Sequence, residues 1–219
     1  PHPAPTHATK THAHPPQYVS TGPAPAAWWP AQLSDLQTSP PLRPPAMFTS
    51  QTTIYTDGSG ASGRAKATHK TPAGWGFVAM DTHVRQEVAG AVLTNPNDIR
   101  WLGAYVGSNN TGELTAILEG AVWAYHTPNI TAVDFRYDSK YAANLADENW
   151  QPQSNFLLVA AVRAALRQLK TRVPVTFTHV KAHSGDLWNE RVDALAKYGS
   201  RMFVPPPING NYKSFCIVL

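Results

Sequence analysis

The chain has 219 residues, of which 42% are hydrophobic and 15% are charged, whereas a typical soluble domain carries roughly 25% charged residues. Its single cysteine excludes a disulfide framework and any metal site built from several cysteines. No apolar run approaches the ~18 residues that a membrane span needs. We therefore expect an intracellular chain, of the nucleus or cytoplasm, with one sizeable core and no stable membrane association.

The prolines divide the chain into regions. Twelve of the 20 prolines lie in the first fifty residues, where charges are few, so residues 1–50 are predicted to be a disordered leader or linker rich in Pro, Ala, Thr and His. A folded domain is predicted over residues 51–201, followed by a C-terminal tail over 202–219. Residues 51–200 carry 14 basic and 13 acidic side chains, which excludes a polybasic clamp for nucleic acid.

Hydrophobic periodicity predicts five strands and four helices in the folded domain. The first three strands follow one another, and the second and third are joined by a short connection that suits an antiparallel hairpin. This order implies an α/β fold: a mixed five-stranded sheet, with three antiparallel strands and then parallel strands, flanked by helices. The predicted elements are strands over 52–56, 74–80 and 84–93, a helix ending before Pro128, a strand over 131–137, helices over 139–146 and about 158–170, a strand over 173–178 and a helix over 187–201.

Acidic residues stand at the ends of two predicted strands, where Asp57 closes the first and Asp138 closes the fourth. Ligands of such sheets gather beyond the carboxyl ends of parallel strands, so the two carboxylates converge if the strands are neighbours, ~4.8 Å apart. Glu113, in the first turn of the long helix, and Asp193, in the last helix, are candidates for the same place. Four carboxylates together repel one another, and an all-oxygen set selects Mg²⁺ or Mn²⁺ over Zn²⁺.

Each carboxylate also has a structural alternative that is common in proteins. Any one of the four carboxylates is weak evidence for a functional site by itself. Only the four together, with the motifs around them, can decide between a functional and a structural role. The alternatives are a turn at Asp57-Gly58, a capping box with Asn110 as N-cap and Glu113 at its third position, a helix cap at Asp138-Ser139, and an ion pair between Asp193 and Lys197.

Five short motifs provide that context, because they occur in the same order as in a known protein family and on the expected helices, strands and loops. The motifs are Tyr55-Thr56-Asp57-Gly58-Ser59, Asn109-Asn110-Thr111-Gly112-Glu113-Leu114, Tyr137-Asp138-Ser139, His179-Val180-Lys181-Ala182-His183-Ser184-Gly185 and Asn189-Glu190-Arg191-Val192-Asp193. With them, the segment from about 52 to 200 resembles a type 1 ribonuclease H domain, possessing all four acidic positions and the loop histidine of that family.

The resemblance implies a ribonuclease H-like fold and hydrolysis of the RNA strand of RNA:DNA hybrids by catalysis with two Mg²⁺ ions, for which Mn²⁺ can substitute. By analogy, Asp57 bridges both ions. Asp193 helps to hold the ion that activates the attacking water, while Glu113 and Asp138 hold the ion at the leaving 3′ oxygen. The products are 5′-phosphate and 3′-hydroxyl ends. His183 is the mobile histidine that assists proton transfer or product release.

The resemblance also implies residues that bind the substrate. Distinguishing RNA from DNA needs contacts to the 2′-hydroxyl, which the family makes around the Asp-Gly-Ser turn and the start of the first helix. Other positions match an aromatic wall of the DNA-strand channel and parts of a phosphate pocket. The implied residues are Gly58, Ser59, Asn109 and Asn110 for the RNA strand, Trp150 for the wall, and Ser108 and Asn155 for the pocket.

The sequence departs from many family members in one region. Only residues 151–154 separate Trp150 from Asn155, so the basic protrusion of bacterial and animal enzymes is missing, and Val106 stands where some members have Arg. Basic side chains that could contact phosphates, such as Arg163 and Arg167, are better explained as solvated surface. The reduced protrusion resembles retroelement domains, in which a reverse transcriptase in the same polyprotein supplies affinity for the hybrid. Residues 1–50 would then be a linker.

Two other function classes stay open at this point. One is a non-catalytic or partner-dependent hybrid-binding domain of a retroelement polyprotein; loss of a carboxylate would favour the non-catalytic form, and none is lost. The other is a nuclease of the same fold that acts on DNA, against which the Asn pair and the histidine loop argue. The N-terminal histidines are interpreted as part of the biased composition of this region, not as a metal site. The segment Cys216-Ile217-Val218-Leu219 fits a prenylation signal. Whether it acts as one is left open, because the sequence alone does not establish the native C-terminus.

Overall fold

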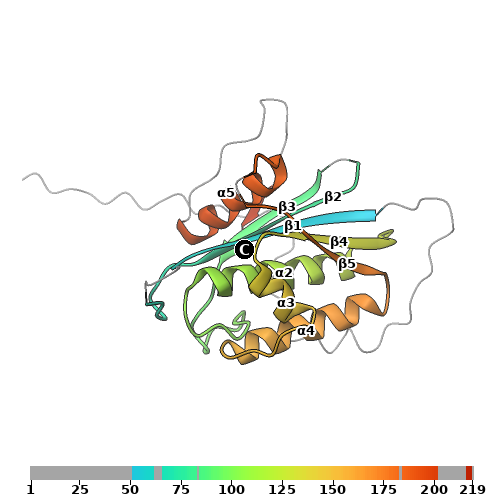
Figure 1. Cartoon of the computed structure of the whole chain (residues 1–219). Helices are drawn as coiled ribbons and strands as arrows, with labels where there is room; N and C mark the ends of the chain where they lie inside the picture. The colour runs from blue at the N-terminus through green and yellow to red at the C-terminus, as the bar shows by residue number, and fades with distance from the viewer. Residues whose placement is uncertain (1–50, 62–65, 83, 183, 202–215, 219) are drawn as a thin grey trace, which may run out of the picture.

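The computed structural model describes residues 51–61, 66–82, 84–182, 184–201 and 216–218 (Figure 1). The predicted leader over residues 1–50 lies outside the described residues, as does most of the predicted tail. His183 also lies outside them.

Strands in the described part of the chain form one sheet. They are β1 (Gln51–Ser59), β2 (Gly74–Met80), β3 (Val84–Ala91), β4 (Ala132–Tyr137), β5 (Val175–His179) and β6 (Cys216–Val218), in the order β5-β4-β1-β2-β3-β6. The β1–β2 and β2–β3 pairs are antiparallel, and β4 pairs in parallel with both β1 and β5. The predicted mixed sheet is thereby confirmed. Strand β6, which was not predicted, pairs in parallel with the edge of β3.

Helices lie on both faces of this sheet (Figure 1). Helix α2 packs against β1 and β2 and also contacts α3 and α4, whereas α5 packs on β1, β2 and β3. None of the helices in the described ranges is both long and apolar enough to cross a membrane. The helices are α2 (Asn109–His126), α3 (Lys140–Ala146), α4 (Phe156–Lys170) and α5 (Leu187–Arg201).

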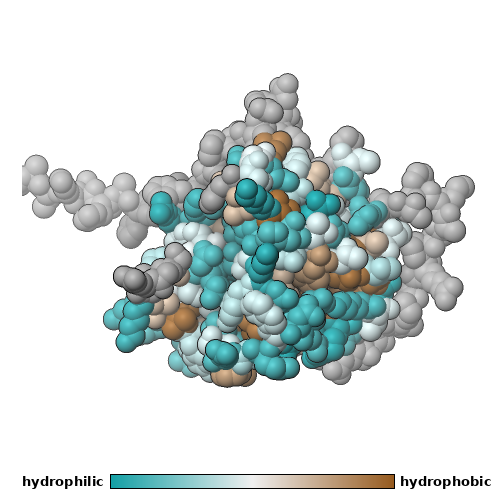
Figure 2. Space-filling model, in the orientation of Figure 1, coloured by the Kyte–Doolittle hydropathy of each residue, from teal (hydrophilic) through white to brown (hydrophobic). Residues whose placement is uncertain are grey.

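The sheet separates a larger core from a smaller one. Successive residues of a strand point to opposite faces, so Ile54 joins the cluster on the side of α2 and α4, whereas Tyr55 joins the cluster under α5. Ile54 and Phe135 of the larger core are fully buried, and each such side chain contributes ~1.5–3 kcal/mol to stability. Figure 2 shows mainly hydrophilic residues on the described surface in this view, with the hydrophobic ones in separate patches.

Helix α5 is fixed on its face of the sheet by a buried ion pair. The Arg191 guanidinium donates to both carboxylate oxygens of Glu87 on β3, at 3.0 and 2.7 Å. The two side chains are only 4% and 2% exposed. Removing one partner of such a pair leaves an uncompensated buried charge, at a cost of ~3–5 kcal/mol. The pair therefore fixes where the residues of α5 lie relative to β3.

The start of α2 differs from the capping box that the sequence offered as a structural alternative for Glu113. Ser108, not Asn110, is the N-cap, and its hydroxyl accepts a hydrogen bond from the Thr111 N–H at 3.2 Å. The Thr111 hydroxyl in turn accepts one from the Ser108 N–H at 2.9 Å. The structural alternative is therefore not realised, because the Thr111 hydroxyl takes the part that the alternative assigned to Glu113. Glu113 is consequently not used as a cap.

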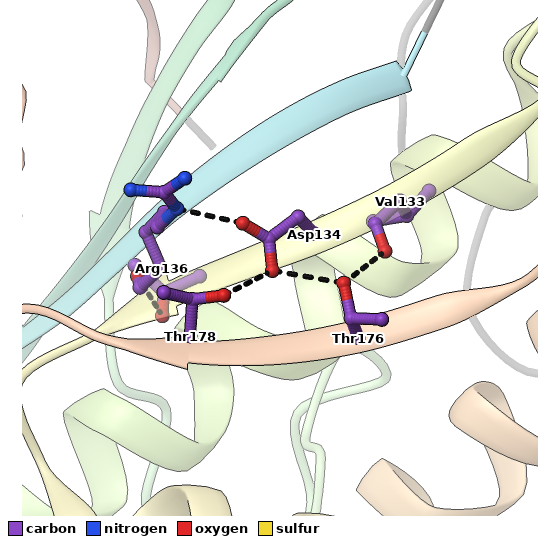
Figure 3. A network of polar contacts seen from close by, with 6 residues as sticks. Val133, Asp134, Arg136, Thr176 and Thr178 are labelled. Carbon is purple, nitrogen blue, oxygen red and sulfur yellow. Dashed lines mark hydrogen bonds and ion pairs between the residues drawn. The ribbon is translucent and has the colours of Figure 1, made fainter.

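A second polar arrangement lies on β4 and β5 (Figure 3). The register of β4 with β1 places Asp134 on the same face of the sheet as Tyr55. Asp134 is 3% exposed, yet its carboxylate accepts hydrogen bonds from the hydroxyls of Thr176 and Thr178 at 2.9 and 2.8 Å. Its other oxygen accepts one from Arg136 Nε at 2.6 Å. This buried charge is thus fully paired, which is how a buried carboxylate is tolerated.

Candidate active site

Three carboxylates from separate elements meet at the carboxyl end of the central strands. Asp57 comes from β1, and Asp138 follows β4. Glu113 lies in the second turn of α2 rather than in the expected first turn, because the helix already begins at Asn109. One oxygen of each lies within 4.8 Å of the others. The cause is topological, because β1 and β4 are parallel neighbours and their ends stand side by side.

A glycine permits the close approach of α2 to β1. A Cβ atom on Gly58 would lie 2.1 Å from the backbone nitrogen of Glu113 and 2.5 Å from the carbonyl carbon of Gly112. A side chain at this position would therefore push away the first turn of α2. The Gly58 N–H also donates to Asp57 Oδ1 at 2.7 Å, which holds that carboxylate in place.

The environment of Asp57 and Glu113 disfavours their charged forms. Burial raises the pKa of Asp57 to about 7, and the charges of Asp138 and Asp193 act in the same direction, while the Gly58 N–H opposes them. Burial likewise holds the pKa of Glu113 well above its ordinary value, helped by Asp57 and Asp138. A cluster that resists ionisation in this way needs either protons or a cation to compensate its charge.

The oxygen atoms that could act as metal ligands in this cluster fit a hard divalent cation. Glu113 Oε1 accepts a hydrogen bond from Asn109 Nδ2 at 3.4 Å, but no described residue donates to the buried Oε2. Every potential ligand in the cluster is a carboxylate oxygen, and Mg²⁺ and Mn²⁺ prefer such ligands. The residues present therefore fit the metal site expected from the sequence.

Asp193 stands apart from the three-carboxylate cluster. It lies on α5, its side chain is 27% exposed, and its Oδ2 accepts from Lys197 Nζ at 2.6 Å. The ion pair named as an alternative is thus present. The charge of Asp193 nevertheless contributes to the raised pKa of Asp57, which places it within electrostatic reach of the cluster.

The alternative cap at the fourth strand involves a neighbour of Asp138 instead. Ser139 is the N-cap of α3, and its hydroxyl accepts from the Ala142 N–H at 3.4 Å. Asp138 is left to face Asn189, whose Nδ2 donates to Asp138 Oδ2 at 3.4 Å. Sequence reasoning gave no role to Asn189. The available signal was a polar residue on the buried face of α5, close to Asp193 in the chain.

The predicted substrate-binding residues fall into two groups. One group lies at the end of β1 and the start of α2: Gly58 and Ser59 end β1, Ser108 caps α2, Asn109 contacts Glu113, and Asn110 is exposed. The other group lies between α3 and α4. There, Trp150 is 49% exposed and Asn155 is the N-cap of α4, with a left-handed backbone (φ 55°) and no side-chain capping bond.

Two arginines near Trp150 have structural partners. Arg163 donates through Nε to the Leu145 carbonyl at 2.9 Å and through Nη2 to the Trp150 carbonyl at 2.6 Å. Arg167 pairs with Glu148 at 2.8 Å on the surface. The contacts of Arg163 anchor the segment between α3 and α4.

Comparisons with known proteins agree with this arrangement. The RNase H family model matches residues 49–201. The ribonuclease H of Chlorobium phaeovibrioides is 32% identical over 159 residues, which cover 68% of this chain and 94% of that protein. The ribonuclease H of Syntrophomonas wolfei is 32% identical over 158 residues, which cover 66% and 92%.

Solved structures share the fold. RNase H1 of Halobacterium salinarum aligns with a TM-score of 0.51 and 20% identity, over 68% of this chain and 96% of that one. The prototype foamy virus protease-reverse transcriptase aligns with a TM-score of 0.51 and 19% identity, over 74% of this chain and 22% of that one. Together with the match of the family model, these findings show that the chain belongs to the RNase H family, the ribonucleases of RNA:DNA hybrids.

Proposed function

We propose that this chain cleaves the RNA strand of RNA:DNA hybrids with two divalent metal ions, leaving 5′-phosphate and 3′-hydroxyl ends. The observation that carries the proposal is the convergence of Asp57, Glu113 and Asp138 in one cluster, in which burial raises the pKa of Asp57 and Glu113. Family membership supports the choice of substrate. The non-catalytic alternative is not favoured, because every expected carboxylate is present in the sequence.

Each carboxylate has a distinct part in the proposed mechanism. Two bound Mg²⁺ or Mn²⁺ ions would activate a water for attack and stabilise the charge that develops on the leaving 3′ oxygen. Asp57 is the ligand proposed to be shared by both ions. Glu113 and Asp138 complete one metal site, and Asp193 contributes to the other after separating from Lys197. His183 is proposed to assist proton transfer or product release.

Selectivity for RNA is proposed to come from the start of α2 and the end of β1. The 2′-hydroxyl both donates and accepts hydrogen bonds, so it can be recognised by backbone groups and amide side chains. Gly58, Ser59, Asn109 and Asn110 supply such groups beside the carboxylate cluster. Trp150 is proposed to form an aromatic wall of the channel for the DNA strand, and Ser108 and Asn155 are proposed to belong to a phosphate pocket.

Affinity for the hybrid is proposed to depend partly on a reverse transcriptase domain in the same or a longer polyprotein. Residues 51–200 carry almost balanced charge, so few phosphates can be neutralised by this domain alone. Arg163 and Arg167, which lie near the missing protrusion, are engaged with protein groups. The shared fold of the foamy virus protein supports this setting.

Cleavage assays test the proposal directly. A labelled RNA:DNA hybrid, an RNA duplex and a DNA duplex of one sequence are incubated with Mg²⁺, Mn²⁺ or EDTA. We expect metal-dependent cutting of the RNA in the hybrid only, lost in Asp57→Asn and kept in Asp147→Asn. Asp147 is a matched control because it pairs with Lys170 on the surface at 2.8 Å. Cutting that survives in Asp57→Asn would overturn the assigned site.

A further inference from the structure

Asn189 occupies an unusual position for an uncharged polar residue. It lies in the first turn of α5 and is 4% exposed, on the face of the helix that packs against the sheet. Its Nδ2 donates to Asp138 Oδ2 at 3.4 Å. Asn189 therefore contacts one of the three clustered carboxylates directly, from an element that is distant in sequence.

The carbonyl end of the same side chain is buried without compensation. No described residue donates a hydrogen bond to Asn189 Oδ1. A buried polar atom without a partner costs ~1–3 kcal/mol, so the amide is not explained by the stability of the fold. Exchanging the amide oxygen and nitrogen does not help, because the oxygen would then face the Asp138 carboxylate and two acceptors would be opposed.

The surrounding structure fixes where this amide can lie. Asp186 Oδ1 accepts hydrogen bonds from the backbone N–H groups of Trp188 and Asn189, both at 3.0 Å, which caps the start of α5. Two residues beyond Asn189, the buried pair of Arg191 with Glu87 holds the helix on β3. Asn189 is thus presented to Asp138 by a rigid element, as a group that orients a ligand must be.

We propose that Asn189 is a positioning residue for the metal site: its amide group orients Asp138, and its Oδ1 accepts a hydrogen bond from a water in the shell of the bound ion. The inference rests on the proposed function, since it requires the carboxylate cluster to bind a divalent ion. Hydrogen bonds to ligating carboxylates are a general feature of metal sites, and their loss typically lowers metal affinity ~10–100-fold.

The hydrogen bond has a specific consequence for Asp138. Because Asn189 Nδ2 donates to Asp138 Oδ2, the other oxygen of Asp138 is left available as a metal ligand. The same hydrogen bond restricts rotation of the Asp138 carboxylate before an ion binds. Such preorganisation lowers the entropic cost of binding. A residue with this role affects the affinity of the site for metal more than it affects folding.

The test uses Asn189→Leu in the full chain, because leucine has a similar shape and removes both polar atoms. We measure Mn²⁺ affinity by calorimetry without nucleic acid, and the thermal midpoint in EDTA. We expect a ~10–100-fold weaker Mn²⁺ affinity, with a midpoint in EDTA equal to or above that of the wild type. Asn189→Ala, which adds no bulk, provides the same comparison if the leucine variant does not fold.

The matched control is Asn144→Leu, on helix α3 next to Asp138. Asn144 Nδ2 donates to the Lys140 carbonyl at 2.7 Å and does not contact the cluster. The control is expected to keep wild-type Mn²⁺ affinity. Unchanged affinity in a folded Asn189 variant, or an equal loss in the control, overturns this inference alone. Failure of the wild type to bind Mn²⁺ overturns the proposed metal site itself.

Discussion

A single buried carboxylate within β4 and a cluster of three carboxylates beyond the end of the same strand differ in how the fold treats them. Asp134 receives hydrogen bonds from Thr176, Thr178 and Arg136, so its charge is paired within the protein (Figure 3). At the end of the same strand, Asp138 joins Asp57 and Glu113, where burial and mutual repulsion raise the pKa of the latter two.

The difference distinguishes a carboxylate whose hydrogen bonds are satisfied within the protein from carboxylates that are available to a ligand. The fold could have supplied donors to the cluster, as it does for Asp134 with two threonines and an arginine. It supplies few instead, so the cluster keeps acceptor atoms such as Glu113 Oε2 without a described partner. Unpaired buried acceptors lower stability, and a divalent cation compensates them. The Asp134 group therefore serves as an internal control for the cluster.

The largest expected effect is the loss of turnover in Glu113→Gln. We expect the rate of hybrid cleavage to fall on the order of 10³-fold, because one charged ligand of the metal site is lost. Stability in EDTA should change little, since the raised pKa of Glu113 favours the neutral form that glutamine resembles. Cleavage assays and thermal unfolding check the two parts. A rate close to wild type would contradict the assignment.

The next effect is a pH dependence of stability in the metal-free protein. The pKa of Asp57 is about 7 in the fold, against an ordinary value of 3.8. The folded state thus binds the proton more tightly, so this contribution to stability is complete below about pH 4 and is lost as the pH rises through 7. Its size is on the order of a few kcal/mol.

Urea unfolding in EDTA between pH 5 and pH 8 measures this loss. In Asp57→Asn the dependence should be flatter, and at pH 8 the variant should be more stable than the wild type. Added Mn²⁺ should stabilise the wild type more at pH 8 than at pH 5, because binding requires deprotonated ligands. A wild-type profile that rises with pH in EDTA would contradict the assigned environment of Asp57.

A smaller effect of opposite sign is expected on the structural side of the comparison. Asp134→Asn should destabilise the protein by ~1–3 kcal/mol, because the amide NH2 that replaces one carboxylate oxygen cannot accept a hydrogen bond and leaves the donor on that side without an acceptor. Cleavage rate at saturating Mg²⁺ should stay near wild type. Urea unfolding and the cleavage assay measure both. A stabilised Asp134→Asn, or one that is inactive while folded, would remove the distinction between the two groups.

The smallest expected effect concerns the surface ion pair of Asp193. Lys197→Met should change stability by less than ~0.5 kcal/mol, because an exposed pair one turn apart contributes little. Urea unfolding measures it, with Asp147→Asn as the comparison for another surface pair. A loss of several kcal/mol would show that the pair is structural, which would argue against a part for Asp193 in the metal site.

Much of the fold could be predicted because its cause is local. Alternation along β1 places Ile54 and Tyr55 on opposite faces, and the order of strands and helices implied the mixed sheet. The same order predicted that Asp57 and Asp138 meet, once β1 and β4 are neighbours. The metal roles and the substrate residues came from the resemblance, not from spacing.

Other features of the fold could not be predicted from the sequence. They depend either on which of two equivalent local signals is used or on contacts between residues that are distant in the chain. Ser108 and Asn110 are both good N-caps, and the hydroxyl of Thr111 decides between them. Strand β6 is three residues long and pairs with β3, which is distant in sequence, so no local pattern announces it. The contact of Asn189 with Asp138 spans 51 positions and depends on how α5 docks.

The most direct test of the central claim is a calorimetric titration of Mn²⁺ into the wild type, Asp57→Asn and Asp134→Asn without nucleic acid. The account predicts that the wild type and Asp134→Asn bind Mn²⁺ with similar affinity, and that Asp57→Asn loses the binding. Equal binding by all three proteins, or no binding by the wild type, would contradict the claim that the cluster of Asp57, Glu113 and Asp138 is a metal site.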